Sequence, residues 1–326
     1  MDISFVEEQA IIHEEKALRG TLTLPKIDIK KLPAVLIING SGSADRDGNI
    51  KKPNIEANIY KDLAHFITGL GFITLRYDKR GIGESEGNPL RVGMQGLVRD
   101  VICNIEFLKN HSRIDPSKII LLGHSEGCIL ATIANTTSPV AGLILLGGAG
   151  TNLREPIAYQ NAQTAEEVKK ISGVKGFFLR RIMNDKKIVK QQEDLYTKVM
   201  ASTGDKMRYK FQKLPAKWLR EHFQYGKEDI LNILKGFQVP ILAITGDKDV
   251  QVDPADIGRL KSLDKENIQG TVIKNMDHML KEFKGDKTVI NLMKQYKKEA
   301  SQPTHPMLKE ALAGWLQQFR SSKIRD

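Results

Sequence analysis

The sequence predicts an α/β fold: a mostly parallel central sheet, helices on both of its faces, and a helical cap insertion. Strand-like and helix-like segments alternate along most of the 326 residues, and this order is typical of a parallel sheet covered by helices. The alternation stops after residue 149 and resumes at residue 237. We therefore predict one discontinuous core domain, residues 1–149 and 237–326, and a helical lid at 150–236.

The first half of the predicted core begins with an antiparallel pair of strands at residues 10–25, which ends at Pro25. Residues 33–39, PAVLIIN, form a continuous apolar run, which is typical of a strand buried on both faces. A helix at 56–71 carries its apolar residues on one stripe and ends at glycine. The elements that follow are strands at 72–78, 118–123 and 139–148 and helices at 96–111 and 125–136.

The insertion at 150–236 contains helix-like stretches and no convincing buried strand. It carries 18 Lys and Arg against 10 Asp and Glu, and so holds much of the net charge of +11. Such a lid could favour acidic substrates or an anionic membrane surface, or it could be an ordinary solvated helical face. We expect its underside to pack on the core or line an acyl pocket through Phe177, Phe178, Leu179, Trp218, Leu219 and Phe223. The core then resumes with strands at 239–246 and 269–275 and helices at 254–264 and 305–319.

Composition narrows the class of protein. The N-terminal residues carry acids where a signal peptide would be basic and then apolar, and no apolar run approaches the roughly 18 residues that span a bilayer. Cys103 and Cys128 are too few for a disulfide framework or a thiolate zinc site. We expect a cytoplasmic protein with no integral membrane association, no nucleic-acid partner, no metal and no cofactor. The oligomeric state stays open.

The stretch KIILLGHSEGCILATIAN, residues 118–135, carries the chemistry. A strand runs into Gly123-His124-Ser125-Glu126-Gly127 and then into a helix, which is the form of a nucleophile elbow. The turn must be tight to expose the serine hydroxyl above the sheet edge, so the flanking positions favour glycine, which has no Cβ. The helix that begins at Ser125 directs its free N–H groups toward the reacting centre. Ser125 is therefore the predicted nucleophile.

A serine nucleophile needs a base, and the base needs an acid that orients it. In elbow proteins these partners follow on loops after later strands, and here His278 follows the strand at 269–275. For the acid we prefer Asp249 to Asp247, because an acid three residues beyond the strand can reach back across the sheet, whereas Asp247 would make a local turn contact. The other histidines are placed less well for a base: His13, His65, His111, His124, His222 and His305.

Acyl transfer also needs N–H donors for the developing oxyanion. One should be the backbone N–H of Glu126, directly after the nucleophile. The other should come from the loop GSGSADRDGN after the strand at 33–39, where Gly40 and Gly42 let the backbone approach a substrate. We predict that the Ser41 N–H is this second donor. The DRDGN part of the loop is expected to be a turn and not a calcium site.

The ordered set NGSGSADRDGN, YDKRGIGES, GHSEG, GDKDVQVDP and NMDHML resembles the α/β-hydrolase superfamily. More narrowly, it is similar to bacterial esterases and serine-aminopeptidase-like hydrolases. The resemblance covers about residues 1–150 and 237–322, and it implies an α/β-hydrolase fold with Ser125, Asp249 and His278 as nucleophile, acid and base. Where many members carry His-Gly at the oxyanion loop, this chain has Asn39-Gly40.

We therefore expect a serine hydrolase that cleaves carboxylic esters of small or medium acyl substrates through an acyl-enzyme. A peptidase, or an acyltransferase or thioesterase, could use the same triad. A peptidase specific for free amino termini should keep an acidic anchor near the pocket, and Glu126 is the one candidate. A non-catalytic small-molecule receptor is the remote alternative, since that role usually goes with a damaged triad.

Overall fold

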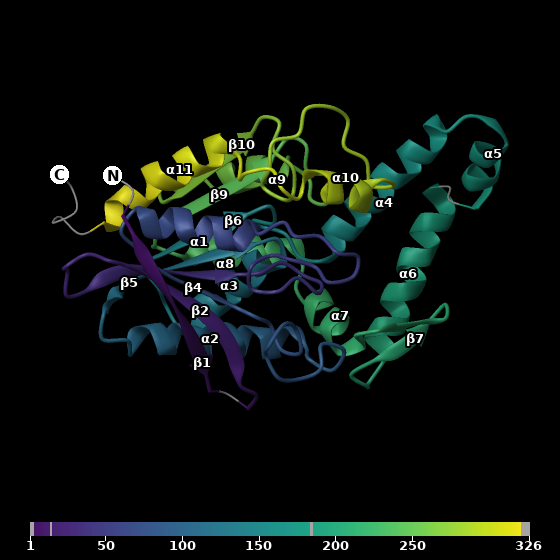
Figure 1. Ribbon diagram of the computed structural model, residues 1–326. Coiled ribbons are helices and arrows are strands. Elements are labelled where there is room, and N and C mark those ends of the chain that lie inside the picture. The colour runs from purple at the N-terminus through teal and green to yellow at the C-terminus, as the bar shows by residue number, and fades with distance from the viewer. Residues whose placement is uncertain (1–2, 14, 183–184, 321–326) are drawn as a thin grey trace.

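The structure describes residues 3–13, 15–182 and 185–320, and Figure 1 shows it as a computed structural model. Its eight-stranded sheet consists of β1 (Phe5–Ile12), β2 (Leu18–Pro25), β3 (Leu32–Ile38), β4 (Ile73–Tyr77), β5 (Ile114–His124), β6 (Gly142–Leu146), β9 (Ile241–Gly246) and β10 (Ile268–Ile273). The strand order is β1-β2-β4-β3-β5-β6-β9-β10. Neighbours from β4 to β10 are parallel, whereas β2 is antiparallel to both β1 and β4. The predicted mostly parallel sheet is confirmed.

Helices cover both faces of the sheet, as the alternation predicts (Figure 1). The helices of one face are α2 (Met94–Lys109), α3 (Glu126–Thr137), α8 (Lys227–Gly236) and α9 (Asp256–Lys261), and those of the other are α1 (Ile59–Gly69) and α11 (Pro306–Leu316). In β3, Leu36 and Ile38 belong to the apolar cluster of the first face, and Val35 and Ile37 belong to that of the second. Successive side chains of a strand point to opposite faces, so this apolar run is buried on both sides.

A segment between β6 and α8 extends away from the sheet (Figure 1). We call residues 154–223 the cap; its elements are α4 (Arg154–Lys170), α5 (Gly173–Ile182), α6 (Asp185–Ala201), β7 (Met207–Tyr209), β8 (Gln212–Leu214) and α7 (Ala216–Phe223). The cap has a small apolar cluster of its own, built around Val199, Leu219 and Phe223. The prediction that Phe177 and Phe178 lie on a packed underside is wrong, because these side chains are 57% and 58% exposed.

Two helices depart from the sequence expectations. Helix α8 lies in the range 150–236, yet Ile230 and Leu234 belong to the core cluster beside α3. Helix α10 (Leu292–Glu299) was not expected, and only Tyr296 and Glu299 of it are buried, so it has no apolar stripe to reveal it. The last elements among the described residues are α11 and the short helix η1 (Gln317–Phe319). Within the described part of the chain, no helix combines the length and the apolar character needed to cross a membrane.

Candidate active site

Ser125 sits on a strained turn between β5 and α3. Its φ of 54° and ψ of −120° are unusual for a residue with a side chain, and such strain is often found at functional sites. A Cβ at Gly123 would lie 2.3 Å from the carbonyl oxygen of Gly127, and one at Gly127 would lie 2.1 Å from that of Ile38. Glycine is therefore required at both flanking positions, as the elbow pattern predicts.

Asp249 and His278 lie together at the carboxyl ends of β9 and β10. The Asp249 Oδ2 atom is 2.7 Å from His278 Nδ1, and both side chains are buried. The other oxygen of Asp249 accepts hydrogen bonds from the backbone N–H groups of Gln251 and Val252, at 2.8 and 3.0 Å. The carboxylate is thus fixed from both sides, and the proton on Nδ1 points at it.

The alternative acid, Asp247, has a different place. Its side chain is exposed, and its Oδ1 atom accepts a hydrogen bond of 2.6 Å from the backbone N–H of Asn275. This is the local turn contact expected of it. The structure therefore brings Asp249, and not Asp247, to His278.

The electrostatics around His278 favour its protonated form. Burial alone would lower the pKa of His278, but the negative charge of Asp249 and the hydrogen bond to it raise that pKa above its ordinary value. A nearby carboxylate that stabilises the imidazolium is what a histidine needs to accept a proton from a hydroxyl.

Residues at the end of β6 lie between Ser125 and the Asp249–His278 pair. A Cβ at Gly147 would lie 3.3 Å from His278 Nδ1 and 3.5 Å from Asp249 Oδ2. A Cβ at the next residue, Gly148, would lie 2.6 Å from the carbonyl oxygen of Ser125. Ser125 and the Asp249–His278 pair therefore lie next to two consecutive glycines of the same loop.

His124 links the elbow to the loop of His278 from inside the protein. Its Nε2 donates to the carbonyl oxygen of His278 at 2.9 Å, and its Nδ1 accepts from the Tyr60 hydroxyl at 2.9 Å. The Tyr60 oxygen in turn accepts a hydrogen bond from the Gly40 N–H at 2.9 Å. Burial lowers the pKa of His124 to about 3, so the ring stays neutral and keeps this donor and acceptor pattern.

The loop after β3 runs against the nucleophile. A Cβ at Gly40 would lie 3.1 Å from the Cβ of Ser125. Because glycine has no Cβ, the backbone at Gly40 can lie this close to the serine. Ser41 follows and lines the same cavity as Ser125 and Glu126. Farther along, Asp45 Oδ1 accepts from the N–H groups of Asp47 and Asn49 at 3.0 and 2.9 Å, which makes the DRDGN segment a turn.

Glu126 has a larger role than its sequence position indicated. Its buried carboxylate lies 2.6 Å from Lys79 Nζ, 2.5 Å from Trp218 Nε1 and 2.9 Å from His222 Nε2. Burial alone would raise the pKa of Glu126, but the charge of Lys79 and the contact with His222 outweigh it, and the pKa is held well below its usual range. Trp218 and His222 belong to α7, so this carboxylate joins the elbow to the cap.

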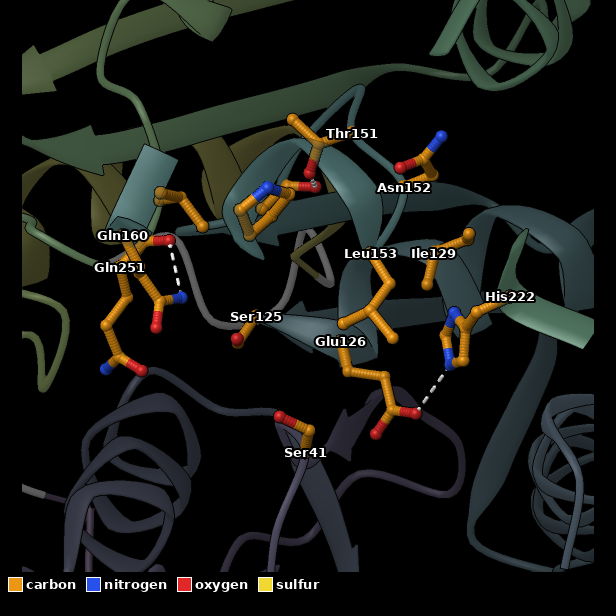
Figure 2. Close-up of a pocket in the computed structure, with 13 residues that line it drawn as sticks. Ser41, Ser125, Glu126, Ile129, Thr151, Asn152, Leu153, Gln160, His222 and Gln251 are labelled. Carbon is orange, nitrogen blue, oxygen red and sulfur yellow. Dashed lines mark hydrogen bonds and ion pairs between the residues drawn. The ribbon is translucent and has the colours of Figure 1, made fainter. Parts of the chain in front are cut away.

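The cavity above Ser125 has a volume of about 70 Å³. Ser125 lies near its centre, with Gln160 and Gln251 on one side and Glu126 and His222 on the other (Figure 2). The cap contributes Pro156, Gln160 and His222 to the wall, and the loop that leads into α4 contributes Thr151, Asn152 and Leu153. The described residues also contain no group of acidic, histidine or cysteine side chains arranged to hold a metal.

Comparison with known protein sequences gives related hydrolases. Esterase EstD of Thermotoga maritima is 26% identical over 294 residues, which is 90% of this chain and 64% of the esterase. The chain therefore spans less than two thirds of the length of that relative.

Comparison with solved structures gives the same fold at low identity. Est1E of Butyrivibrio proteoclasticus, solved with ferulic acid, superposes with a TM-score of 0.56 at 17% identity over 89% of this chain and 96% of its own. The α/β hydrolase GrgF of a Penicillium species gives a TM-score of 0.53 at 17% identity over 85% and 91%. These likenesses establish the α/β-hydrolase fold.

The sequence model of a family described as serine aminopeptidase, S33, matches residues 54–282. This range includes the elbow, the cap, Asp249 and His278. Because the match covers more than half of the chain and the fold agrees with it, the chain belongs to the S33 serine aminopeptidase family of α/β hydrolases.

Proposed function

We propose that this chain hydrolyses carboxylic esters of short acyl groups through an acyl-enzyme on Ser125. The observation that carries the proposal is the 2.7 Å contact of buried Asp249 with His278, next to the strained turn of Ser125. A nucleophile, a base and an orienting acid from separate strands meet at one edge of the sheet. This arrangement is the general requirement for serine acyl transfer.

In the proposed reaction, His278 takes the proton of the Ser125 hydroxyl as the oxygen attacks the ester carbonyl. The tetrahedral oxyanion accepts hydrogen bonds from the N–H groups of Ser41 and Glu126. His278 then gives its proton to the leaving alcohol, which leaves an acyl-serine. A water molecule, deprotonated by His278, attacks this ester, and the acid departs with Ser125 restored. Asp249 holds the imidazole tautomer throughout.

The size of the cavity supports a short acyl group. A cavity of about 150 Å³ holds benzene, so the 70 Å³ above Ser125 suits roughly three non-hydrogen atoms. The lining is mixed, with Ile129 and Leu153 beside Gln160 and Gln251. We therefore propose acetyl and propionyl esters as better substrates than esters of long fatty acids.

Ester hydrolysis is favoured over aminopeptidase activity, although the family description names the latter. An exopeptidase must bind the charged amino terminus of its substrate, and Glu126 is the acid among the described residues that line the cavity. Both of its oxygens already accept hydrogen bonds, one from Lys79 and the other from Trp218 and His222. This carboxylate is therefore engaged within the protein, and the name of the relative EstD also supports an esterase.

The test is turnover of p-nitrophenyl esters with acyl chains of two to twelve carbons, beside aminoacyl p-nitroanilides. We expect kcat/KM to be highest for the two- and three-carbon acyl groups and to fall with chain length. Ser125→Ala should lower kcat by about 10⁶-fold, whereas exposed, remote Ser117→Ala should not. Faster cleavage of the anilides than of the esters would favour a peptidase. Labelling of Ser125 by a fluorophosphonate without hydrolysis of either series would favour an acyltransferase.

A further inference from the structure

Lys79 lies between the two backbone segments that hold the proposed oxyanion donors. It follows β4 in the YDKRGIGES stretch, and its side chain is buried. Its ammonium group donates to the carbonyl oxygen of Gly40 at 2.7 Å and to Glu126 Oε2 at 2.6 Å. One cation therefore contacts the loop after β3 and the residue directly after the nucleophile.

The contact with Gly40 acts on one particular peptide group. The Gly40 carbonyl and the Ser41 N–H belong to the same trans peptide, so they point in opposite directions and turn together. A cation at the carbonyl oxygen fixes the direction of the N–H and also polarises the peptide, which strengthens the N–H as a donor. The preceding peptide is held as well, because the Gly40 N–H donates to Tyr60.

The contact with the Glu126 carboxylate links the residue that carries the second donor to the loop that carries the first. Trp218 and His222 bind the other carboxylate oxygen, so both oxygens of Glu126 are engaged within the protein. Buried ion pairs contribute little net stability compared with apolar residues of the same volume. A buried Lys–Glu pair at this position is thus better explained by the geometry it imposes than by the stability it adds.

We infer that Lys79 is a positioning residue for the oxyanion hole. It sets the Ser41 and Glu126 N–H groups at the distance that a tetrahedral oxyanion requires. The inference rests on the ester hydrolysis proposed above. Lys79 is not among the described residues that line the cavity at Ser125. It acts on the transition state through the Gly40–Ser41 peptide and the Glu126 side chain, so its loss should lower kcat and leave ground-state binding nearly unchanged.

The experiment compares wild type with Lys79→Met, using p-nitrophenyl acetate turnover and the affinity of a trifluoromethyl ketone that forms a tetrahedral adduct with a serine. We expect kcat to fall roughly 10- to 100-fold, KM to change less than about threefold, and ketone affinity to fall by a similar factor to kcat. Lys109→Met is the control, because Lys109 also binds a carboxylate and a serine but lies far from the site. That variant should retain wild-type kcat and ketone affinity.

Two results would overturn the inference while the proposed function stands: a Lys79→Met protein with wild-type kcat, or one in which KM rises and kcat does not change. If the wild type itself neither turns over esters nor reacts with a fluorophosphonate, the proposed function fails instead. Should Lys79→Met not fold, the Lys79→Met/Glu126→Gln protein takes its place, since it removes both buried charges. The same loss of kcat and ketone affinity is expected of the double variant, and its absence would count against Lys79.

Discussion

Two buried carboxylates of this protein each contact a histidine, and they differ in everything else around them. Asp249 lies 2.7 Å from His278, and its free oxygen accepts from two backbone N–H groups. Glu126 lies 2.9 Å from His222, and its other oxygen binds the Lys79 ammonium. The first pair is built within the core, from loops after neighbouring strands. The second joins the core to the cap.

The difference shows how surroundings decide what a carboxylate can do. The Asp249 charge is balanced by backbone N–H dipoles, and it raises the pKa of His278, which favours the protonated imidazole. The Glu126 charge is balanced by a full cation, and its geometry ties three segments of the chain together. In the proposed reaction, a carboxylate beside a histidine thus supports a base in one region and a positioning contact in the other.

The largest expected effect is a loss of kcat when the Asp249–His278 pair is changed. Asp249→Asn should lower kcat by about 10⁴-fold, because an amide no longer holds the His278 tautomer or stabilises its imidazolium. The measurement is single-substrate kinetics on p-nitrophenyl acetate. Asp247→Asn is the matched control. Its kcat should stay close to wild type, because the contact described for the Asp247 side chain is a turn hydrogen bond with the Asn275 N–H. A large loss in Asp247→Asn with little in Asp249→Asn would reverse the assignment of the acid.

Much of this contrast could be predicted from the sequence. Ser125, Asp249 and His278 each follow a clear strand, and loops at the carboxyl ends of parallel strands must meet at one edge, so local patterns were enough to nominate the core pair. The pair in the second region joins parts of the chain about 100 residues apart. Trp218 and His222 are four residues apart and so share one face of α7, but nothing local in the cap indicates what that face meets.

The position of Lys79 cannot be predicted from the sequence for a related reason. Lysine side chains are usually exposed, and nothing local in YDKRGIGES indicates that this one is buried. Its burial depends on a carbonyl that is 39 residues away and a carboxylate that is 47 residues away. Helix α10 was missed because two buried residues leave no periodic signal. In each case the missing information was tertiary.

A smaller effect is expected on the free energy of unfolding when the buried Lys79–Glu126 pair is changed. Glu126→Gln leaves the Lys79 charge buried without its counter-charge, so the free energy of unfolding should fall by about 3 kcal/mol in urea titrations. Lys79→Met/Glu126→Gln should recover part of that loss, because no uncompensated charge remains. A double variant that is less stable than both single variants would contradict this account of the pair.

The smallest expected effect is a displacement of the pH profile. His278 must be neutral to act as a base, so kcat/KM should rise as pH increases through its pKa, and Asp249 sets that midpoint above the ordinary histidine value of about 6.5. In Asp249→Asn the midpoint of the remaining activity should move to lower pH, since the carboxylate that favours the imidazolium is gone. In Glu126→Gln the midpoint should stay at the wild-type value, because that carboxylate bonds to His222 and not to His278. A midpoint that moved with Glu126 and ignored Asp249 would mean that His222, and not His278, is the titrating base.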